Sequence, residues 1–215
     1  MLKILLPWLL ALIAYGMFLA WYQNWRGPLS EQEVRQYRAR LEASPMAEQG
    51  DVRVLADFLA RDDGRPFVMV NLIKLAGEPV PDPVTGVPRP AADLLDEYSR
   101  VFLGAALRRA SHPVLVAGKV GGYVDAWNVE ADPGGVATDW TALGLVRYRS
   151  RRDLAELVLM DGVDAAHGYK IAAMPATLAF PSQIRMALLL SPQVWFGLLL
   201  ALFAALGSLV IALLR

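Results

Sequence analysis

The chain lacks cysteine altogether and has only two histidines, His112 and His167, among its 215 residues. Disulfide bonds, thiolate catalysis and cysteine-ligated metal sites are therefore excluded. Two histidines so far apart in sequence cannot make a histidine-rich metal centre, and we predict no metal and no cofactor. Net charge is also absent, because 21 basic residues balance 21 acidic ones. No basic field exists to attract nucleic acid, so nucleic acid is not an expected partner.

Two long segments at the ends of the chain contain no charged residue. The first, Ile4–Tyr22, would form a helix of about 28 Å, close to the ~30 Å apolar core of a bilayer. The second, Met186–Leu214, lies between two arginines, and its Ser191 and Pro192 are typical of a helix start. We predict transmembrane helices within residues 1–26 and 186–215, with the lipid bilayer as a partner. A cleaved signal peptide is the alternative for the first segment.

The small residues of the second segment fall on one helical face: Gly197, Ala201, Ala204, Ala205, Ser208 and Ala212. Small side chains let helix backbones approach closely in lipid. We predict that this face packs on the first span or on another integral membrane protein, and the alternative is ordinary alanine-rich composition. Neither segment holds an ionisable residue, which argues against an ion or proton path through these two helices alone.

Two spans place both termini on the same side of the membrane. The short amino-terminal tail carries Lys3, which favours a cytoplasmic tail and a domain on the periplasmic face of a bacterial-type inner membrane. Arg26, Arg35 and Arg185 on the domain side favour the opposite orientation, but long loops translocate largely regardless of their charge.

The pattern of capping and apolar residues in residues 27–65 predicts two short helices. Ser30 and Glu33 have the spacing of a capping box at the start of the first helix. The second helix is expected over about Asp51–Arg61. We interpret the pair as a helical collar between the membrane and the next domain.

Residues 66–181 predict an α+β domain. Its helices are expected over Ala92–Arg109 and after a capping Ser150, and Gly77–Pro90 is expected to be a loop because five of its residues are proline. The strands are expected at Phe67–Leu75, Val114–Lys119 with an optional extension to Val124, Trp140–Tyr148 and Tyr169–Phe180. This β-α-β-β-α-β order is that of a ferredoxin-like split βαβ domain, an antiparallel sheet with two helices on one face. A second sheet, the collar helices or a ligand must cover the other face.

Three segments carry a resemblance to a known family: VMVNLIKL, VRYRSRRDLAEL and HGYKIAAMPATLAF. They are similar to the dimeric α+β-barrel superfamily, and within it to the uncharacterised family called domain of unknown function 1330. The resemblance spans roughly Pro66–Phe180. It implies a fold and a tendency to pair sheets face to face, and the superfamily includes cofactor-free monooxygenases, muconolactone-type isomerases and haem-binding enzymes. It does not imply one reaction.

Four polar residues are candidates for chemistry in this domain: Asn71, Tyr98, Arg147 and His167. Asn71 stands in an apolar strand row and must find hydrogen bonds, either with a ligand or with the protein itself. His167 could act as a general base, since histidine is the residue type that changes charge near neutral pH, and Asp164 could orient it if that segment is helical.

Other features have two readings each. Arg147 belongs to a group with Arg149, Arg151 and Arg152 that could bind a carboxylate or phosphate, or could instead form a solvated edge or contact lipid headgroups. Trp127 and Trp140 either line a pocket or close the core.

The sequence shows no complete catalytic constellation. We therefore predict a membrane-anchored accessory or interaction subunit of a larger membrane protein complex. The alternative is a membrane-tethered enzyme or binding protein for a small apolar substrate in the sheet cavity. A homo-oligomer that pairs sheets without a pocket is the third possibility.

Overall fold

The chain divides near Trp25 and Gln183 into two units, which are described in turn. The computed structural model describes residues 2–44, 52–125, 139–187 and 191–214, and the side chains of Leu2 and Asp164 are not part of that description. Trp127 lies outside the described residues.

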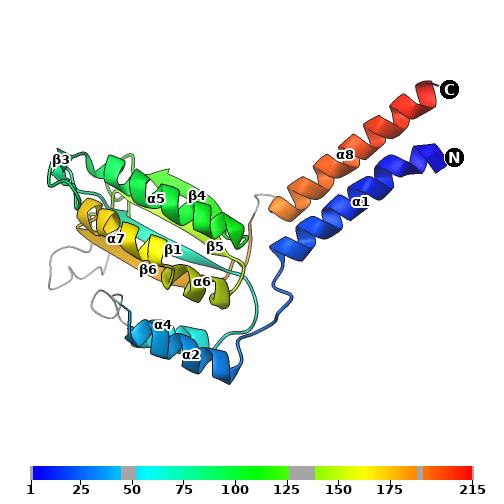
Figure 1. Ribbon diagram of the computed structural model, residues 1–215. Helices are drawn as coiled ribbons and strands as arrows, with labels where there is room; N and C mark the ends of the chain where they lie inside the picture. The colour runs from blue at the N-terminus through cyan, green and yellow to red at the C-terminus, as the bar shows by residue number, and fades with distance from the viewer. Residues whose placement is uncertain (1, 45–51, 126–138, 188–190, 215) are drawn as a thin grey trace. The chain divides into compact units, whose positions relative to one another are not determined.

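The first unit pairs helix α1, Leu2–Tyr22, with helix α8, Pro192–Leu213 (Figure 1). Both helices are long and apolar enough to cross a membrane. Small residues of α8 allow the close approach: a β-carbon on Gly207 would lie 3.3 Å from Pro7 Cγ, and Ser208 Oγ donates to the Ile4 carbonyl oxygen at 2.8 Å.

The second unit is built on a four-stranded antiparallel sheet with strand order β4-β5-β1-β6. The central strand is the predicted apolar run, and Asn71 on it stands opposite Gly144 on β5. The strands are β1 (Phe67–Lys74), β4 (His112–Gly118), β5 (Ala142–Tyr148) and β6 (Ala176–Ser182).

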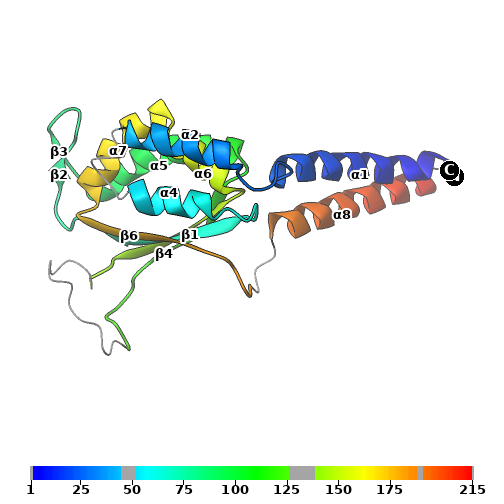
Figure 2. The same cartoon turned by 90° about the horizontal axis from the view of Figure 1, so that it is seen from below.

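Helices cover one face of this sheet (Figure 2). They are α2 (Glu31–Glu42), α4 (Val52–Ala60), α5 (Ala91–Arg108), α6 (Arg151–Val158) and α7 (Asp161–Ala173). The helices expected to form a collar, α2 and α4, pack on α6, where Leu41, Leu59 and Ala155 form one buried cluster. They belong to the same unit as the sheet and lie on its helical side.

The other face of the sheet carries alternate apolar residues from all four strands. Three of them, Leu115, Leu178 and Phe180, are 41%, 50% and 44% exposed. The idea that the collar helices cover this face is wrong, because α2 and α4 lie on the opposite face (Figure 2). The strand register places Val70, Leu72, Leu143 and Leu145 on the same open face.

Three expectations about secondary structure need correction. A strand over Tyr169–Phe180 is wrong, because α7 continues to Ala173 and β6 begins only at Ala176. The extension of β4 to Val124 is also wrong, because the strand ends at Gly118. The proline-rich loop contains a short hairpin, β2 (Val80–Pro81) with β3 (Pro88–Arg89).

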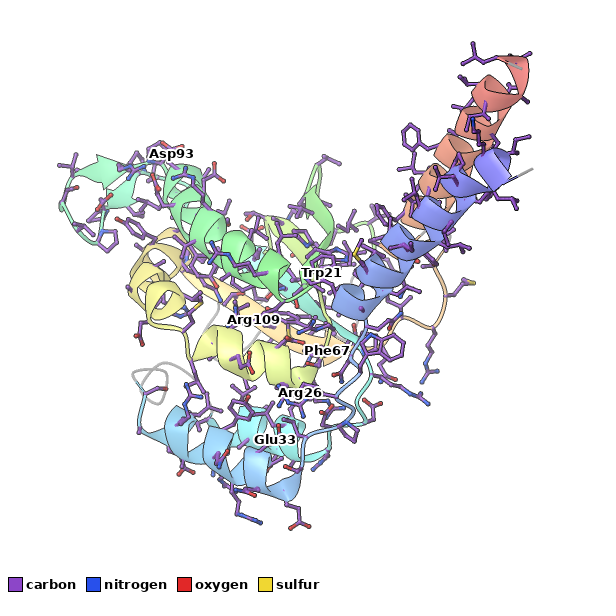
Figure 3. All side chains as sticks on the ribbon, turned by 45° about the vertical axis from the view of Figure 1, so that its right-hand side comes forward. Trp21, Arg26, Glu33, Phe67, Asp93 and Arg109 are labelled. Carbon is purple, nitrogen blue, oxygen red and sulfur yellow. The ribbon has the colours of Figure 1, made fainter. Side chains whose placement is uncertain are left out.

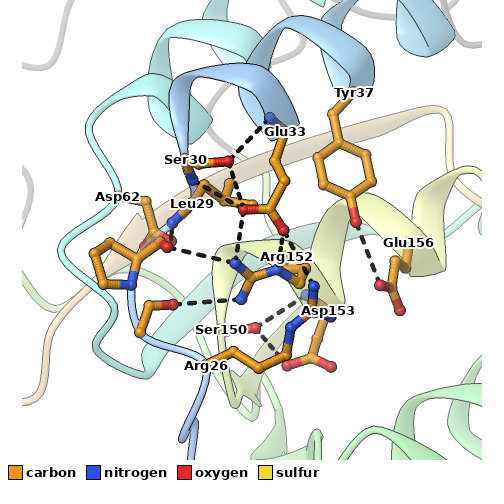
Figure 4. Close-up of polar contacts among 12 residues, drawn as sticks. Arg26, Leu29, Ser30, Glu33, Tyr37, Asp62, Ser150, Arg152, Asp153 and Glu156 are labelled. Atoms are coloured by element: carbon orange, nitrogen blue, oxygen red, sulfur yellow. Dashed lines mark hydrogen bonds and ion pairs between the residues drawn. The ribbon is translucent and has the colours of Figure 1, made fainter.

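A network of charged groups fixes α2 on α6 (Figure 4). Arg152 donates from Nε and Nη2 to the two carboxylate oxygens of Glu33, at 3.0 and 3.1 Å. Glu33 also completes the predicted capping box with Ser30, which is confirmed. The hydrogen bond from Arg152, followed by the one from the Ser30 backbone, lowers the pKa of Glu33 from 4.5 to about 2.

The same interface includes a second carboxylate, Glu156. It accepts a hydrogen bond from the Tyr37 hydroxyl at 3.3 Å. Arg109, just after α5 (Figure 3), donates from Nε to Glu156 Oε2 at 3.4 Å. The predicted Ser150 cap of α6 is confirmed, since its hydroxyl accepts from the Asp153 amide. The polar groups of this interface are therefore matched by the chain itself.

Candidate functional site

A cavity of about 390 Å³ lies between the sheet and helices α5, α6 and α7. This volume falls in the range typical of small-molecule sites. Val116, at the β4 side of the cavity, is 73% exposed, so the cavity reaches the surface along that strand. The apolar lining includes Met69, Ile73, Leu95, Phe102, Leu103, Val146, Leu154, Leu157, Val163 and Met174.

The position of the cavity follows from a break in the core. One buried cluster surrounds Phe67 and Tyr148 at one end of the sheet, and another surrounds Leu94 and Met174 at the other end. Between them lies Gly144, where a β-carbon would meet only Ile73 Cδ1 at 3.8 Å and Asn71 Cβ at 4.0 Å. The missing side chain leaves this part of the sheet floor uncovered.

Asn71 lies on the floor beside Gly144 and lines the cavity. Its Nδ2 donates to the carbonyl oxygens of Met69 and Gly144, both at 3.2 Å. These two bonds use both amide hydrogens and fix the side chain. The contacts of the described residues leave Oδ1 as the atom that can still accept a hydrogen bond.

Tyr98 of α5 and His167 of α7 line the cavity from the helical side. Their rings meet edge to face, with centroids 6.1 Å apart. Burial raises the pKa of Tyr98 to about 12, so its hydroxyl keeps its proton at neutral pH. The segment around His167 is helical, as the Asp164 hypothesis requires, but the Asp164 side chain lies outside the description.

Tyr148 is a cavity residue that sequence reasoning did not single out. It is 5% exposed, and its ring stacks on Phe67 with centroids 5.1 Å apart. Burial first, and then nearby Tyr98, raises the pKa of its hydroxyl well above the ordinary value. Among the described residues, neither the Tyr98 nor the Tyr148 hydroxyl has a hydrogen-bond partner. Two protonated hydroxyl groups are thus available to a molecule in the cavity.

Lys170 is the second residue missed at the sequence level and the one fully charged group in the described lining. Its Nζ lies 5.7 Å from the centre of the Tyr98 ring. No described carboxylate lies within ion-pair distance of it. Burial lowers the pKa of Lys170, because an apolar surrounding disfavours the ammonium form. The signal in the sequence was its spacing, three residues after His167, but the expected strand there concealed it.

Arg147 does not belong to this site. It lies on the other face of β5 from Gly144 and Tyr148, and its Nη1 donates to the Ala110 carbonyl oxygen at 2.9 Å. Its neighbours are engaged within the protein as well. Arg149 donates from Nε to Asp153 at 2.9 Å, and the guanidinium group of Arg151 lies 4.2 Å from the centre of the Phe58 ring. With Arg152 on Glu33, the arginine group holds the fold together.

The small residues of α8 are divided by their surroundings. Gly197 faces Tyr15 of α1, where an added β-carbon would lie 3.4 Å from Cε2, and Ala204 is almost fully buried. Ala201 and Ser208 are partly buried, whereas Ala205 and Ala212 are exposed. The face predicted to bind α1 or another protein is thus largely used against α1.

Within the part of the chain that is described, no group of three His, Asp or Glu side chains is placed to hold a metal ion. The described cavity lining contains one imidazole and no carboxylate. The donors in the described lining include two phenols, one ammonium group, an imidazole and the hydroxyl groups of Ser99 and Thr177, which suit an oxygen-bearing organic molecule better than a cation.

Comparisons with known proteins give the fold and nothing more. No family model and no curated protein matches this chain. RPA0582, a protein of unknown function from Rhodopseudomonas palustris, has a similar crystal structure, with a TM-score of 0.51 and 17% identity over 63% of this chain and 94% of that one. A structure of methylated RPA0582 has a TM-score of 0.48 and 20% identity over 65% of this chain and 92% of that one. At this identity the first likeness concerns the fold alone.

Proposed function

We propose that this protein is a membrane-anchored binding protein that holds a small, largely apolar molecule between its sheet and helices α5, α6 and α7. The cavity of about 390 Å³ carries the proposal, because it is apolar overall and yet lined by Asn71, Tyr98 and His167. These are three of the four residues that the sequence marks as candidates. A binding role needs no catalytic constellation, and turnover of the bound molecule is an extension of the same proposal.

The domain that holds the cavity is, in this proposal, a ferredoxin-like domain related to the dimeric α+β barrels and to the domain of unknown function 1330 family. The strand order supports it: taken in chain order, the sheet strands lie as 2-3-1-4, all antiparallel. One helix follows the first strand and two follow the third. This is the split βαβ arrangement with one additional helix.

The anchor in this proposal is the pair α1 and α8, both of which cross the bacterial inner membrane. Their length and composition support it, as does the ladder of close contacts between Gly197, Gly207 and the facing helix. We place the domain on the periplasmic face, because Lys3 lies at the amino-terminal end of α1 and favours a cytoplasmic location for that end. Fusion of a reporter that is active only in the cytoplasm to the carboxyl terminus tests this, since both termini would then be cytoplasmic.

The binding role is tested by recovering the molecule itself. The full chain is purified from its native membrane in mild detergent, denatured and extracted, and the extract is analysed by mass spectrometry. Gly144→Leu fills the floor of the cavity, whereas Gly162→Leu adds the same side chain at an exposed position of α7 with no heavy atom within 4 Å. We expect one small molecule in near-equimolar yield from the wild type and Gly162→Leu, and none from Gly144→Leu. Equal recovery from all three would mean that the molecule is ordinary bound lipid, and the proposal would fail.

A second candidate function is that of an interaction subunit in a larger membrane complex. The open face of the sheet favours it, because Leu115, Leu178 and Phe180 expose apolar surface there. The mass of the particle in mild detergent distinguishes the cases. A dimer mass indicates pairing of two copies, and a larger mass indicates another membrane protein. A monomer mass excludes both and leaves the binding role alone.

A further inference from the structure

Lys170 stands out among the described cations of the domain because it is largely buried in an apolar cavity without a described carboxylate beside it. It lines the cavity, and the described part of the chain offers it no carboxylate. An ammonium group in apolar surroundings is unfavourable unless an anion or several hydrogen-bond acceptors accompany it. A bound molecule that brings a negative charge would remove this penalty.

The groups around Lys170 also favour a negatively charged ligand. Tyr98 lies next to it, with the Lys170 Nζ 5.7 Å from the ring centre, and Tyr148 lies near Tyr98. Both phenols are protonated, and neither hydroxyl donates to a described residue. The Tyr98 hydroxyl and the Lys170 ammonium group can both donate to an anionic oxygen, and Tyr148 supplies a further O–H donor to the lining. A cationic head group would instead face Lys170, and no described carboxylate in the lining would attract it.

The remaining lining defines the body of the molecule. It is formed by aliphatic and aromatic side chains of the sheet and of α5, α6 and α7. Scaled from a dry cavity of ~150 Å³ that holds benzene, about 390 Å³ holds on the order of 15 non-hydrogen atoms. This is the size of a medium-chain fatty acid or a two-ring aromatic acid.

We infer that the cavity binds a small amphiphilic carboxylate, whose charged head lies beside Lys170 and Tyr98 and whose apolar body fills the space over Gly144. The inference rests on the proposed binding role and adds the chemical class of the molecule. Asn71 acts differently, because both of its amide hydrogens are held by the sheet backbone. Its Oδ1 accepts a hydrogen bond and so does not serve the carboxylate.

The test uses matched probes with the same body. The full chain in lipid nanodiscs is titrated with naphthalene-2-carboxylate and with neutral naphthalene-2-methanol, and empty nanodiscs supply the background. We expect the carboxylate to bind the wild type about tenfold more tightly than the alcohol, since a charge-assisted hydrogen bond replaces a neutral one. Lys170→Met keeps the length of the side chain and removes the charge, so the preference for the carboxylate should disappear while the alcohol still binds.

Lys74→Met is the matched control, because Lys74 lies on the other face of β1 from Asn71 and does not line the cavity. It should bind both probes like the wild type. Equal affinity of the wild type for both probes, or an unchanged preference in Lys170→Met, would overturn the anionic head group but leave the binding role standing. Binding of neither probe by the wild type would count against both the inference and the binding role. Because methionine suits an apolar cavity, Lys170→Met is expected to fold, and circular dichroism checks this.

Discussion

Arg152 and Lys170 are both cations on helices that cover the sheet, but their surroundings differ. The Arg152 side chain is 5% exposed and meets both carboxylate oxygens of Glu33. Lys170 lines an apolar cavity, and no described carboxylate is in reach. The interface of α2 and α6 is thus complete without any other molecule, whereas the cavity contains donors that the chain does not use. Unmatched polar groups inside an otherwise well-paired domain indicate where a ligand belongs.

The largest expected effect comes from removing the Glu33 carboxylate, which pairs with Arg152 at the interface of α2 and α6. Glu33→Gln keeps the hydrogen-bonding shape of the capping box but leaves the buried Arg152 guanidinium without its ion-pair partner. We expect the free energy of unfolding of the domain to fall by about 3 kcal/mol, measured by thermal or urea denaturation of the full chain. Glu31→Gln is the control, because Glu31 is 93% exposed in its pair with Arg35 and should change stability by less than about 0.5 kcal/mol. Equal effects of the two substitutions would show that burial of Arg152 does not matter.

Acid should affect the same pair in the wild type. The pKa of Glu33 is about 2 in the folded protein and 4.5 in the unfolded chain. Between these values the unfolded state binds more protons, so stability is full above pH 4.5 and falls as pH decreases toward 2. Melting temperatures measured across this range should decline less steeply in Glu33→Gln than in the wild type. Parallel curves would mean that the carboxylate is not held in its charged form by Arg152.

Removing the charge of Lys170 should have the opposite effect and raise the stability of the domain. Lys170→Met removes an ammonium group that burial disfavours, and we expect the ligand-free protein to gain about 1 kcal/mol of stability. Lys74→Met should leave stability within about 0.5 kcal/mol of the wild type, since that side chain lies outside the cavity. A loss of stability in Lys170→Met would show that the ammonium group is matched by the fold after all.

The lowered pKa of Lys170 also predicts how stability depends on pH under alkaline conditions. The pKa of Lys170 in the folded protein lies below its value of 10.5 in the unfolded chain. Between the two values the unfolded state binds more protons, so this group's contribution to stability rises with pH. The advantage of Lys170→Met over the wild type should therefore shrink as pH approaches 10.5. Tyrosines also titrate in this range, but their contribution to stability is the same in both proteins and cancels in the difference.

The two helix starts at the interface of α2 and α6 could be predicted because their signals are local, whereas the pairing of Arg152 with Glu33 was not predicted. Ser30 and Glu33 are three residues apart, and Ser150 precedes a helix, so spacing alone identified both helix starts. The strand Phe67–Lys74 was recognised from its continuous apolar run, and α5 from its helical periodicity. Each of these predictions required only neighbours along the chain.

The cavity could not be predicted in the same way, because it depends on contacts between distant segments. Gly144 matters only because the register of β5 on β1 puts it beside Asn71. Lys170 faces the cavity only because α7 is a helix, and its two glycines and weak apolar periodicity concealed that helix. Arg147 was included as a candidate although strand alternation places it opposite Tyr148, and the structure puts it on the other face.

The smallest effect concerns the floor of the cavity. Gly144→Ala adds one methyl group whose nearest neighbours would be Ile73 Cδ1 at 3.8 Å and Asn71 Cβ at 4.0 Å, which is ordinary contact. Alanine also restricts the unfolded chain more than glycine does, so we expect a gain of about 0.5 kcal/mol in the free energy of unfolding. One methyl group takes little of a cavity of about 390 Å³, and binding of naphthalene-2-carboxylate should change less than about threefold. Gly144→Leu should abolish that binding, so loss of binding with Gly144→Ala as well would mean that the backbone at Gly144, and not the space above it, contacts the ligand.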